Sequence, residues 1–163
     1  MSQDLPNFKI PHAEKIEWMV ETNGWAIETV AAGAFTTAEG APFPGYAYSI
    51  NFPAAVGVPE VVVCGLTPVA CRGLFDLVAN LRGSGAELVA DVALLGLFDG
   101  EQRAKFVNVN LDQYGELFDT ATAWHRGSAN YSVWQLLWPD RNGFLPDEVG
   151  FDQRLRFAQP ILV

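Results

Sequence analysis

An acidic and a basic side chain follow the last apolar run of this 163-residue chain, at Asp140 and Arg141. The planar guanidinium of an arginine binds a carboxylate, phosphate or amide through parallel hydrogen bonds. The same residues also fit a polar turn that Asp140 starts and Gly143 closes. The pattern therefore predicts either a ligand site or a turn, and Asp140 and Arg141 are both candidate ligand-binding residues.

Aromatic and amide side chains on two predicted strands supply further candidates. Trp134 and Trp138 lie four residues apart and so on one face of a strand, with Leu136 between them. Two indoles around a leucine form either a core face or a stacking platform. If this strand neighbours the predicted strand at 46–52, the indoles lie near a polar patch of Tyr46, Tyr48, Asn51 and Gln135.

Two titratable residues are candidates for proton transfer. Glu60 stands at the mouth of a predicted central strand, where it is either a solvated strand start or, if partly buried, a proton carrier. His125 ends a predicted helix, where a positive charge complements the helix dipole. As a general base it would need a neighbouring acid or hydroxyl, and the local sequence places none beside it. Glu60 joins the ligand-binding candidates, and no residue is assigned as catalytic.

The two cysteines, Cys64 and Cys71, stand among apolar residues in a predicted strand and helix. They are interpreted as small buried hydrophobes, with a redox pair as the alternative. Together with the two histidines they do not complete a metal-ligand pattern, so no metal site is predicted. The sequence also has no phosphate-binding loop, dinucleotide fingerprint or nucleophile elbow.

The composition argues against several classes of partner. The chain carries 19 acidic and 10 basic residues, for a net charge of −9, which repels nucleic acid and anionic membranes. Its start has no basic segment leading into an apolar one, so we expect no signal peptide, no membrane span and a cytoplasmic location. Half of the residues are hydrophobic, enough for one domain over 1–163, with an extended arm at 1–11 and an irregular segment at 139–163.

Periodicity and turn signals predict the elements of the fold. Helices are expected at 12–22, 68–83 and 110–127, and strands at 25–32, 46–52, 60–66, 87–98, 103–109 and 131–138. The short connections favour antiparallel pairing. We therefore predict an α+β fold, with a small antiparallel β-barrel or a strongly curled antiparallel sheet flanked by about three helices. This order of elements is similar to that of the split-barrel proteins that bind flavin.

Four blocks of sequence resemble a known family. They are Gly24-Trp25, PGYAYSIN at 44–51, PEVVVCGL at 59–66 and QLLWPDRNG at 135–143. In this order and spacing they resemble the bacterial domain-of-unknown-function family 4262, over roughly residues 12–160. The resemblance implies a stand-alone cytoplasmic protein and carries over no catalytic residue. Family members often have a histidine where this chain has Val58.

These observations lead to a functional prediction with two alternatives. The first expectation is a homodimeric ligand- or protein-binding or regulatory module, without a cofactor, because the sequence assembles no catalytic set. The alternative is a flavin-linked or other small-molecule enzyme on a split-barrel-like scaffold, with flavin as its cofactor. A third hypothesis, a partner of a basic protein, rests on acidity and small size alone. The sequence leaves open whether the protein is an enzyme.

Overall fold

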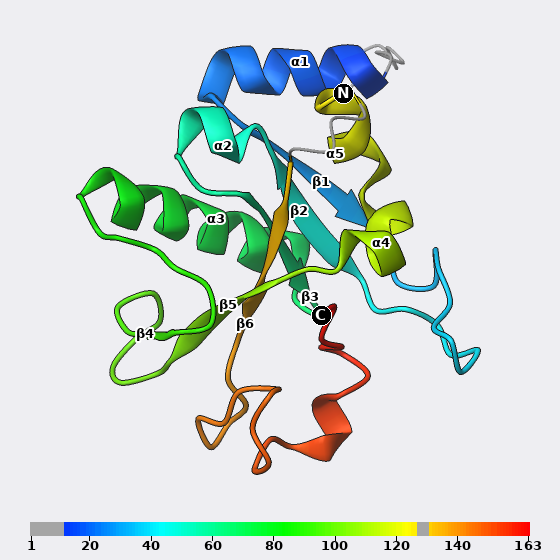
Figure 1. The fold of residues 1–163 in the computed structure, drawn as a ribbon, viewed down its shortest axis with the longest axis vertical. Coiled ribbons are helices and arrows are strands. Elements are labelled where there is room, and N and C mark those ends of the chain that lie inside the picture. The colour runs from blue at the N-terminus through cyan, green and yellow to red at the C-terminus, as the bar shows by residue number, and fades with distance from the viewer. Residues whose placement is uncertain (1–11, 127–130) are drawn as a thin grey trace, which may run out of the picture.

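A six-stranded mixed sheet forms the centre of the protein (Figure 1). The computed structural model describes residues 12–126 and 131–163, so the arm predicted at 1–11 lies outside the described residues. The strand order is β1-β2-β3-β6-β5-β4. The strands are β1 (Ala26–Val30), β2 (Tyr46–Ile50), β3 (Glu60–Cys64), β4 (Ala93–Leu94), β5 (Ala104–Asn108) and β6 (Val133–Leu137). The α+β class is thus confirmed.

The predicted barrel is wrong, because the sheet is not closed. Its edges are β1 and β4, and β6 inserts between β3 and β5 instead of following the sequence order. The β3–β6 pair is parallel, while the other pairs are antiparallel. The parallel β3–β6 pair is joined through α3, β4, β5, α4 and α5, well beyond the roughly dozen residues that a parallel connection needs, and short-range turn signals do not report this pairing. The strand at 46–52 and the last strand are consequently not neighbours, since β3 separates them.

Helices cover both faces of the sheet. Side chains alternate along β3, so that Val61 and Val63 pack on one face and Val62 and Cys64 on the other. The long helix α3 packs on the first face, and α1 and the segment before β6 pack on the second (Figure 1). The helices are α1 (His12–Asn23), α2 (Phe52–Ala55), α3 (Pro68–Gly83), α4 (Leu111–Tyr114) and α5 (Asp119–Trp124), with 3₁₀ turns at Gly115–Phe118 and Gln153–Leu155.

Three predicted elements differ clearly from the structure. Of the strand predicted at 87–98, only Ala93–Leu94 forms a strand, because Asp91 and Gly96 on either side adopt left-handed conformations. The strand predicted at 46–52 ends at Ile50, because Asn51 adopts a left-handed conformation with φ of 81°. Phe52 therefore begins α2 and packs in the core between the sheet and α3, which we call the α3 core. Tyr46 and Tyr48 pack on the opposite face of the sheet. The helix predicted at 110–127 is divided into α4, a 3₁₀ turn that starts at a glycine, and α5, since glycine weakens a helix interior. None of the helices in the described part of the chain has the length and apolarity to cross a membrane.

The C-terminal segment after β6 lies across the ends of β3 and β6. It is irregular apart from the 3₁₀ turn at Gln153–Leu155. It passes so close to Gly65, which has φ of 84°, that a Cβ there would collide with the carbonyl oxygen of Ala158. Leu162 is buried at the end of the segment. Gly65 is therefore required both for its backbone conformation and for its lack of a side chain.

Candidate functional site

The buried carboxylate of Glu60 lies at the centre of a hydrogen-bonded cluster at the start of β3. Its side chain is 0% exposed. Oε1 accepts hydrogen bonds from the Ser49 hydroxyl at 2.8 Å and the Phe52 amide at 3.1 Å. Oε2 accepts from the Asn51 amide at 2.8 Å and from Nε2 of His125 at 2.8 Å. Four donors thus match the roughly four acceptor positions of a carboxylate, which is how a buried charge is tolerated.

The left-handed turn at Asn51 creates this anion site. It directs two successive backbone N–H groups, those of Asn51 and Phe52, toward the same carboxylate. The Asn51 side chain donates to the Gly24 carbonyl at 3.0 Å and accepts from the Trp124 indole at 3.3 Å. The cluster therefore ties the start of β1, the end of β2 and the end of α5 to β3. We call it the Glu60 cluster.

His125 joins this cluster from the C-terminal end of α5. Its amide donates to the Ala121 carbonyl, as expected for a residue that ends a helix, and its ring stacks on Tyr131 at 4.7 Å. The sequence showed no acid beside His125, but the fold brings Glu60 to it from 65 residues away. Because the carboxylate accepts from Nε2, a neutral ring has its free lone pair at Nδ1. Such a carboxylate–imidazole pair can orient a general base.

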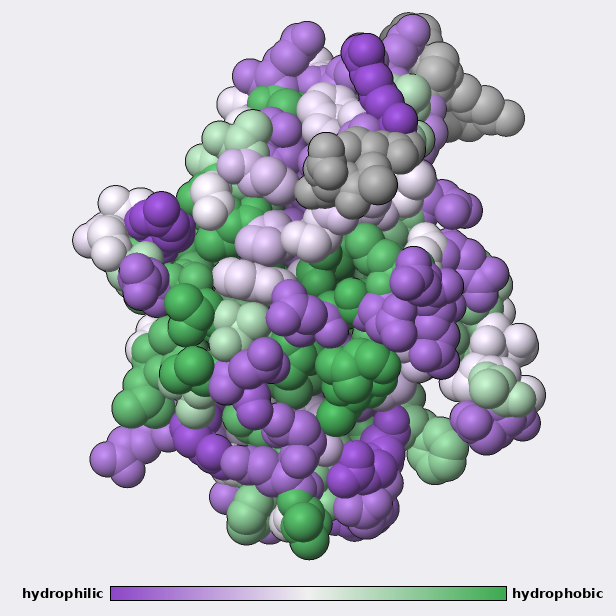
Figure 2. All heavy atoms as spheres, in the orientation of Figure 1, coloured by the Kyte–Doolittle hydropathy of each residue, from purple (hydrophilic) through white to green (hydrophobic). Residues whose placement is uncertain are grey.

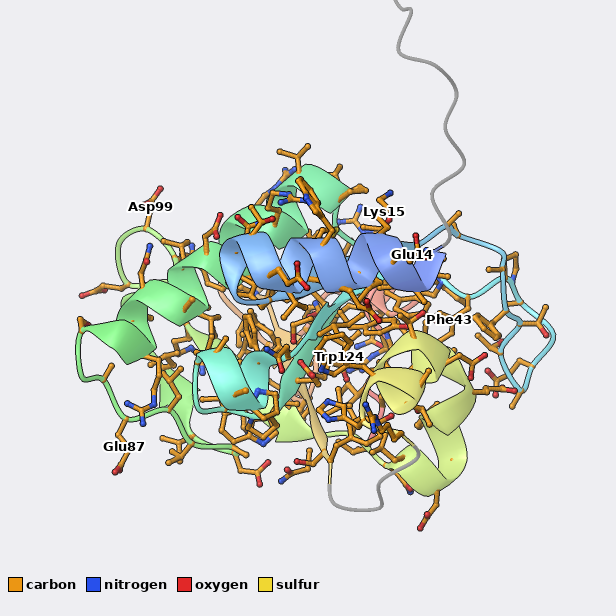
Figure 3. The ribbon with its side chains drawn as sticks, turned by 90° about the horizontal axis from the view of Figure 1, so that it is seen from above. Glu14, Lys15, Phe43, Glu87, Asp99 and Trp124 are labelled. Carbon is orange, nitrogen blue, oxygen red and sulfur yellow. The ribbon has the colours of Figure 1, made fainter. Side chains whose placement is uncertain are left out.

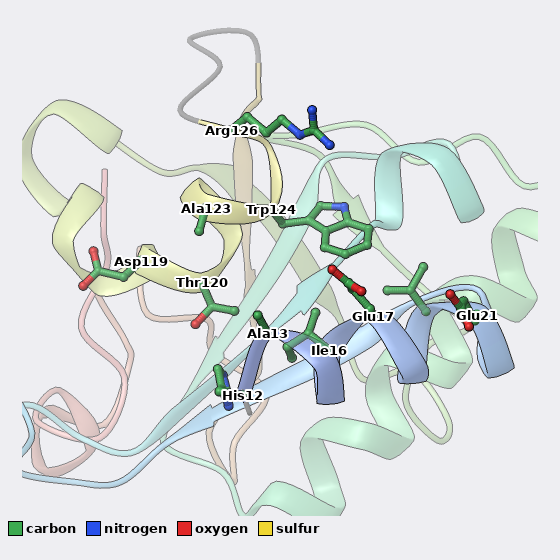
Figure 4. Close-up of a pocket in the computed structure, with 11 residues that line it drawn as sticks. His12, Ala13, Ile16, Glu17, Glu21, Asp119, Thr120, Ala123, Trp124 and Arg126 are labelled. Atoms are coloured by element: carbon green, nitrogen blue, oxygen red, sulfur yellow. The ribbon is translucent and has the colours of Figure 1, made fainter. Parts of the chain in front are cut away.

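A groove with a volume of about 560 Å³ lies between α1 and α5 (Figure 4). We call it the α1–α5 groove. Seen from above, α1 lies beside the segment that contains α5 (Figure 3), and Trp124 at the end of α5 lines the groove between them. The apolar part of the lining is Ala13, Ile16, Val20, Ala123 and Trp124, and the polar part is His12, Glu17, Glu21, Asp119, Thr120 and Arg126. Neither Glu60 nor His125 is part of this lining.

Trp124 connects the groove with the Glu60 cluster. Its indole lines the groove, and Nε1 of the same ring donates to the side-chain oxygen of Asn51. The backbone amide of Asn51 in turn donates to Glu60. At the other end of the groove, Glu28 accepts hydrogen bonds from His12 at 2.6 Å and from the Thr120 hydroxyl at 2.7 Å. Three side chains of the lining, those of His12, Thr120 and Trp124, are therefore fixed by hydrogen bonds before a ligand binds, which lowers the entropy cost of binding.

Four of the nine predicted ligand-binding residues lie around this region. Asn51 and Glu60 belong to the Glu60 cluster. Tyr46 and Tyr48 are buried, and burial raises the pKa of both, that of Tyr48 to about 12. The Tyr46 hydroxyl donates to the Leu117 carbonyl at 2.6 Å, and the Tyr48 hydroxyl accepts from the Thr120 amide at 3.2 Å. The two tyrosines thus support the segment that carries the groove rather than line it.

The three candidates on the last strand lie away from this region. Gln135 donates to the Pro160 carbonyl and accepts from the Leu162 amide, so it fixes the C-terminal segment. The Trp138 indole donates to the Cys64 carbonyl at 2.8 Å, and the Trp134 indole donates to Asn108 at 3.1 Å. Trp134 and Trp138 both pack with the α3 core. This agrees with the interpretation of the two indoles as a core face. The polar patch predicted from these residues and Tyr46 does not form, because β3 lies between the two strands.

The last two candidates lie in the turn after β6. Asp140 accepts from the amides of Asn142, Phe144 and Asp152 at 2.8 to 2.9 Å, so its carboxylate organises the turn. Arg141 is exposed and borders a small cavity of about 310 Å³. The turn that one of the two interpretations predicted is therefore present, and of the two candidates Asp140 is buried and Arg141 faces solvent.

The two cysteines lie apart from each other and from the groove. Cys64 and Cys71 are free, and they pack in different cores on opposite faces of the sheet. Burial raises the pKa of the Cys64 thiol to about 12 and that of Cys71 to about 11, which suppresses thiolate chemistry. In the described ranges, no group of three or more His, Cys, Asp or Glu side chains is arranged to hold a metal ion.

Local sequence patterns do not reveal the residues that form the groove. Trp124 continues a helical apolar stripe, which agrees with its packing but says nothing about its exposed side. Glu17 and Thr120 have no local pattern that distinguishes them from other surface residues. The signal that would find them is the packing of α1 beside α5, which is a tertiary contact.

Comparison with known proteins identifies a family. The family model described as "Domain of unknown function (DUF4262)" matches residues 19–152, most of the chain. No curated protein and no solved structure matches the chain.

Proposed function

The chain belongs to the DUF4262 family, and we propose that this member is a ligand-binding module whose ligand lies in the α1–α5 groove. The observation that supports this proposal is the groove itself. Its volume of about 560 Å³ falls in the range of roughly 300 to 1,000 Å³ typical of small-molecule pockets. Its mixture of apolar and polar lining residues is the composition of such pockets, in which apolar contact gives affinity and a few polar groups give orientation.

A groove-filling variant tests the proposal. Ala123 lines the groove, whereas Ala70 is exposed on α3 and is not part of that lining. The wild type, Ala123→Phe and the matched control Ala70→Phe are dialysed to equilibrium against a cell metabolite extract, and mass spectrometry identifies what each protein retains. We expect the wild type and Ala70→Phe to enrich the same compound and Ala123→Phe to lose it. No enrichment, or equal enrichment by all three proteins, contradicts the proposal.

The second candidate is an enzyme, and the Glu60–His125 pair is the observation that favours it. A carboxylate that fixes one ring nitrogen of a histidine is the arrangement by which many enzymes orient a general base, and the His125 side chain is 17% exposed. A metabolite mixture followed by proton NMR tests this candidate. Turnover that His125→Gln abolishes supports it, and absence of turnover, or unchanged turnover in the variant, contradicts it.

The flavin-linked form of the enzyme is expected from the order of elements, which is similar to that of split-barrel proteins, and the open sheet adds no support to that similarity. Flavin binding itself stays a prediction. An absorption spectrum of the purified protein and thermal shifts with FMN and FAD check it.

The homodimer is also a proposal, supported by the sheet edge at β4. Apolar side chains beside this edge are 45% to 60% exposed, namely Val89, Val92 and Leu95. Figure 2 shows hydrophobic residues gathered over β4 and the loop that leads to it. Exposed apolar groups at a strand edge favour association with a second chain. Sedimentation equilibrium of the wild type and of Val92→Lys measures this, with a monomeric wild type as the contradicting result.

A further inference from the structure

Two carboxylates of α1 border the α1–α5 groove next to an aromatic ring. They belong to Glu17 and Glu21, and the ring is the indole of Trp124. Figure 4 shows Glu17 reaching from α1 toward the indole. Because Glu17 and Glu21 are four residues apart on one helix, they are neighbours on its surface and repel each other. This arrangement does not stabilise α1.

The basic side chains of the groove form no salt bridge with these carboxylates. His12 is hydrogen-bonded to Glu28 at 2.6 Å. Arg126 lies in the lining, but neither it nor another cation within 12–126 and 131–163 forms a salt bridge with Glu17 or Glu21. The net charge of −9 adds a long-range attraction for positive ligands. The side of the groove between α1 and the indole therefore carries two exposed carboxylates beside an aromatic ring.

We infer that the ligand of the groove is an amine with a positively charged head and an apolar body, an inference that rests on the function proposed above. The ammonium group lies against the indole face of Trp124, where the ring quadrupole attracts a cation, and beside the carboxylate of Glu17. The apolar body packs on Ile16 and Ala123. A cation at this position also relieves the repulsion between Glu17 and Glu21, which a neutral ligand leaves in place.

Three probes that share a phenyl ring and differ in charge test the inference. They are phenethylamine, 2-phenylethanol and 3-phenylpropionate, and ligand-observed NMR titrations give their dissociation constants. We expect the amine to bind about tenfold more tightly than the alcohol, the gain typical of one cation–π contact with a carboxylate nearby. The carboxylate probe should bind more weakly than the alcohol. Equal binding of amine and alcohol would overturn the inference.

Two single-charge variants separate a local effect from the effect of net charge. Glu17→Gln removes a carboxylate of the groove, and Glu14→Gln removes an exposed one from α1 outside the lining. We expect Glu17→Gln to reduce the preference for the amine over the alcohol severalfold and Glu14→Gln to leave it unchanged. An equal reduction in both variants would mean that net charge alone attracts the amine, and it would overturn the inference.

The outcomes also distinguish this inference from the proposed function. If Ala123→Phe blocks all three probes and the wild type binds them equally, the groove is a binding site but not one for amines. If none of the probes binds while the dialysis enriches another compound, the ligand class is wrong and the proposed function stands. If Ala123→Phe binds the probes as tightly as the wild type does, the site is elsewhere and both proposals fail.

Discussion

Replacing Glu60 by glutamine is the most informative single change in this protein. The two side chains have nearly the same shape, so the substitution changes the hydrogen bonding of the Glu60 cluster and little else. Each carboxylate oxygen accepts from one backbone amide, Oε1 from Phe52 and Oε2 from Asn51. An amide group has one acceptor and one donor end. In either orientation of the new side chain, therefore, one buried backbone N–H faces another donor.

The expected cost follows from these contacts. A buried backbone donor without a partner costs about 1 to 3 kcal/mol, and a hydrogen bond to a charged group contributes about 1 kcal/mol more than one to a neutral group. We therefore expect Glu60→Gln to lower the free energy of unfolding by about 2 to 4 kcal/mol. For a chain of this size each kcal/mol corresponds to roughly 2 to 4 °C, so the melting temperature should fall by about 4 to 16 °C.

Urea denaturation and differential scanning calorimetry measure this effect. Glu14→Gln, which removes an exposed carboxylate of α1, is the matched control and should stay within about 0.5 kcal/mol of the wild type. Should Glu60→Gln fail to fold, Ser49→Ala removes one donor to the same carboxylate and should cost about 1 to 3 kcal/mol. A Glu60→Gln protein within about 1 kcal/mol of the wild type would refute the view that the four hydrogen bonds stabilise the fold.

Three further predictions concern other parts of the molecule. Gly65→Ala should destabilise the protein by several kcal/mol, because its Cβ would collide with the C-terminal segment. The control Gly73→Ala in α3, where the space is open, should be neutral or stabilising by about 0.5 to 1 kcal/mol, and equal melting temperatures of the two variants would contradict this. Cys64 and Cys71 should resist iodoacetamide at about pH 8 until urea unfolds the chain, because burial raises their thiol pKa values to about 12 and 11. Mass spectrometry counts the adducts, and rapid labelling of the native protein would contradict this. Hydrogen bonds from Arg103 and from the Leu145 amide lower the pKa of Glu148 from 4.5 to about 2, so the contribution of Glu148 to stability is present above pH 4.5 and lost toward pH 2. The difference in unfolding free energy between wild type and Glu148→Gln, at most about 1 kcal/mol for this partly exposed pair, should therefore narrow over that range in urea titrations, and a constant difference would contradict the assignment.

Local signals predicted the elements that depend on neighbouring residues. Thr67 and Pro68 begin α3, and the Thr67 hydroxyl accepts from the Ala70 amide, as a cap residue followed by proline predicts. The continuous apolar run of β3 correctly indicated a central strand. By contrast, nothing local indicated the left-handed turn at Asn51, because the same residues continue the alternating pattern of a strand.

Composition, spacing and motif thus determined the α+β class, the family, and most of the helices and strands, since these depend on interactions between residues close in sequence. The position of β6 between β3 and β5, and with it the open sheet, was decided by long-range pairing. The meeting of Glu60 with His125, and of Glu17 with Trp124, was decided in the same way. Residues far apart along the chain are brought together by the packing of whole elements. The stabilising energy of that packing comes from contacts throughout the core, so no single segment of the sequence predicts it.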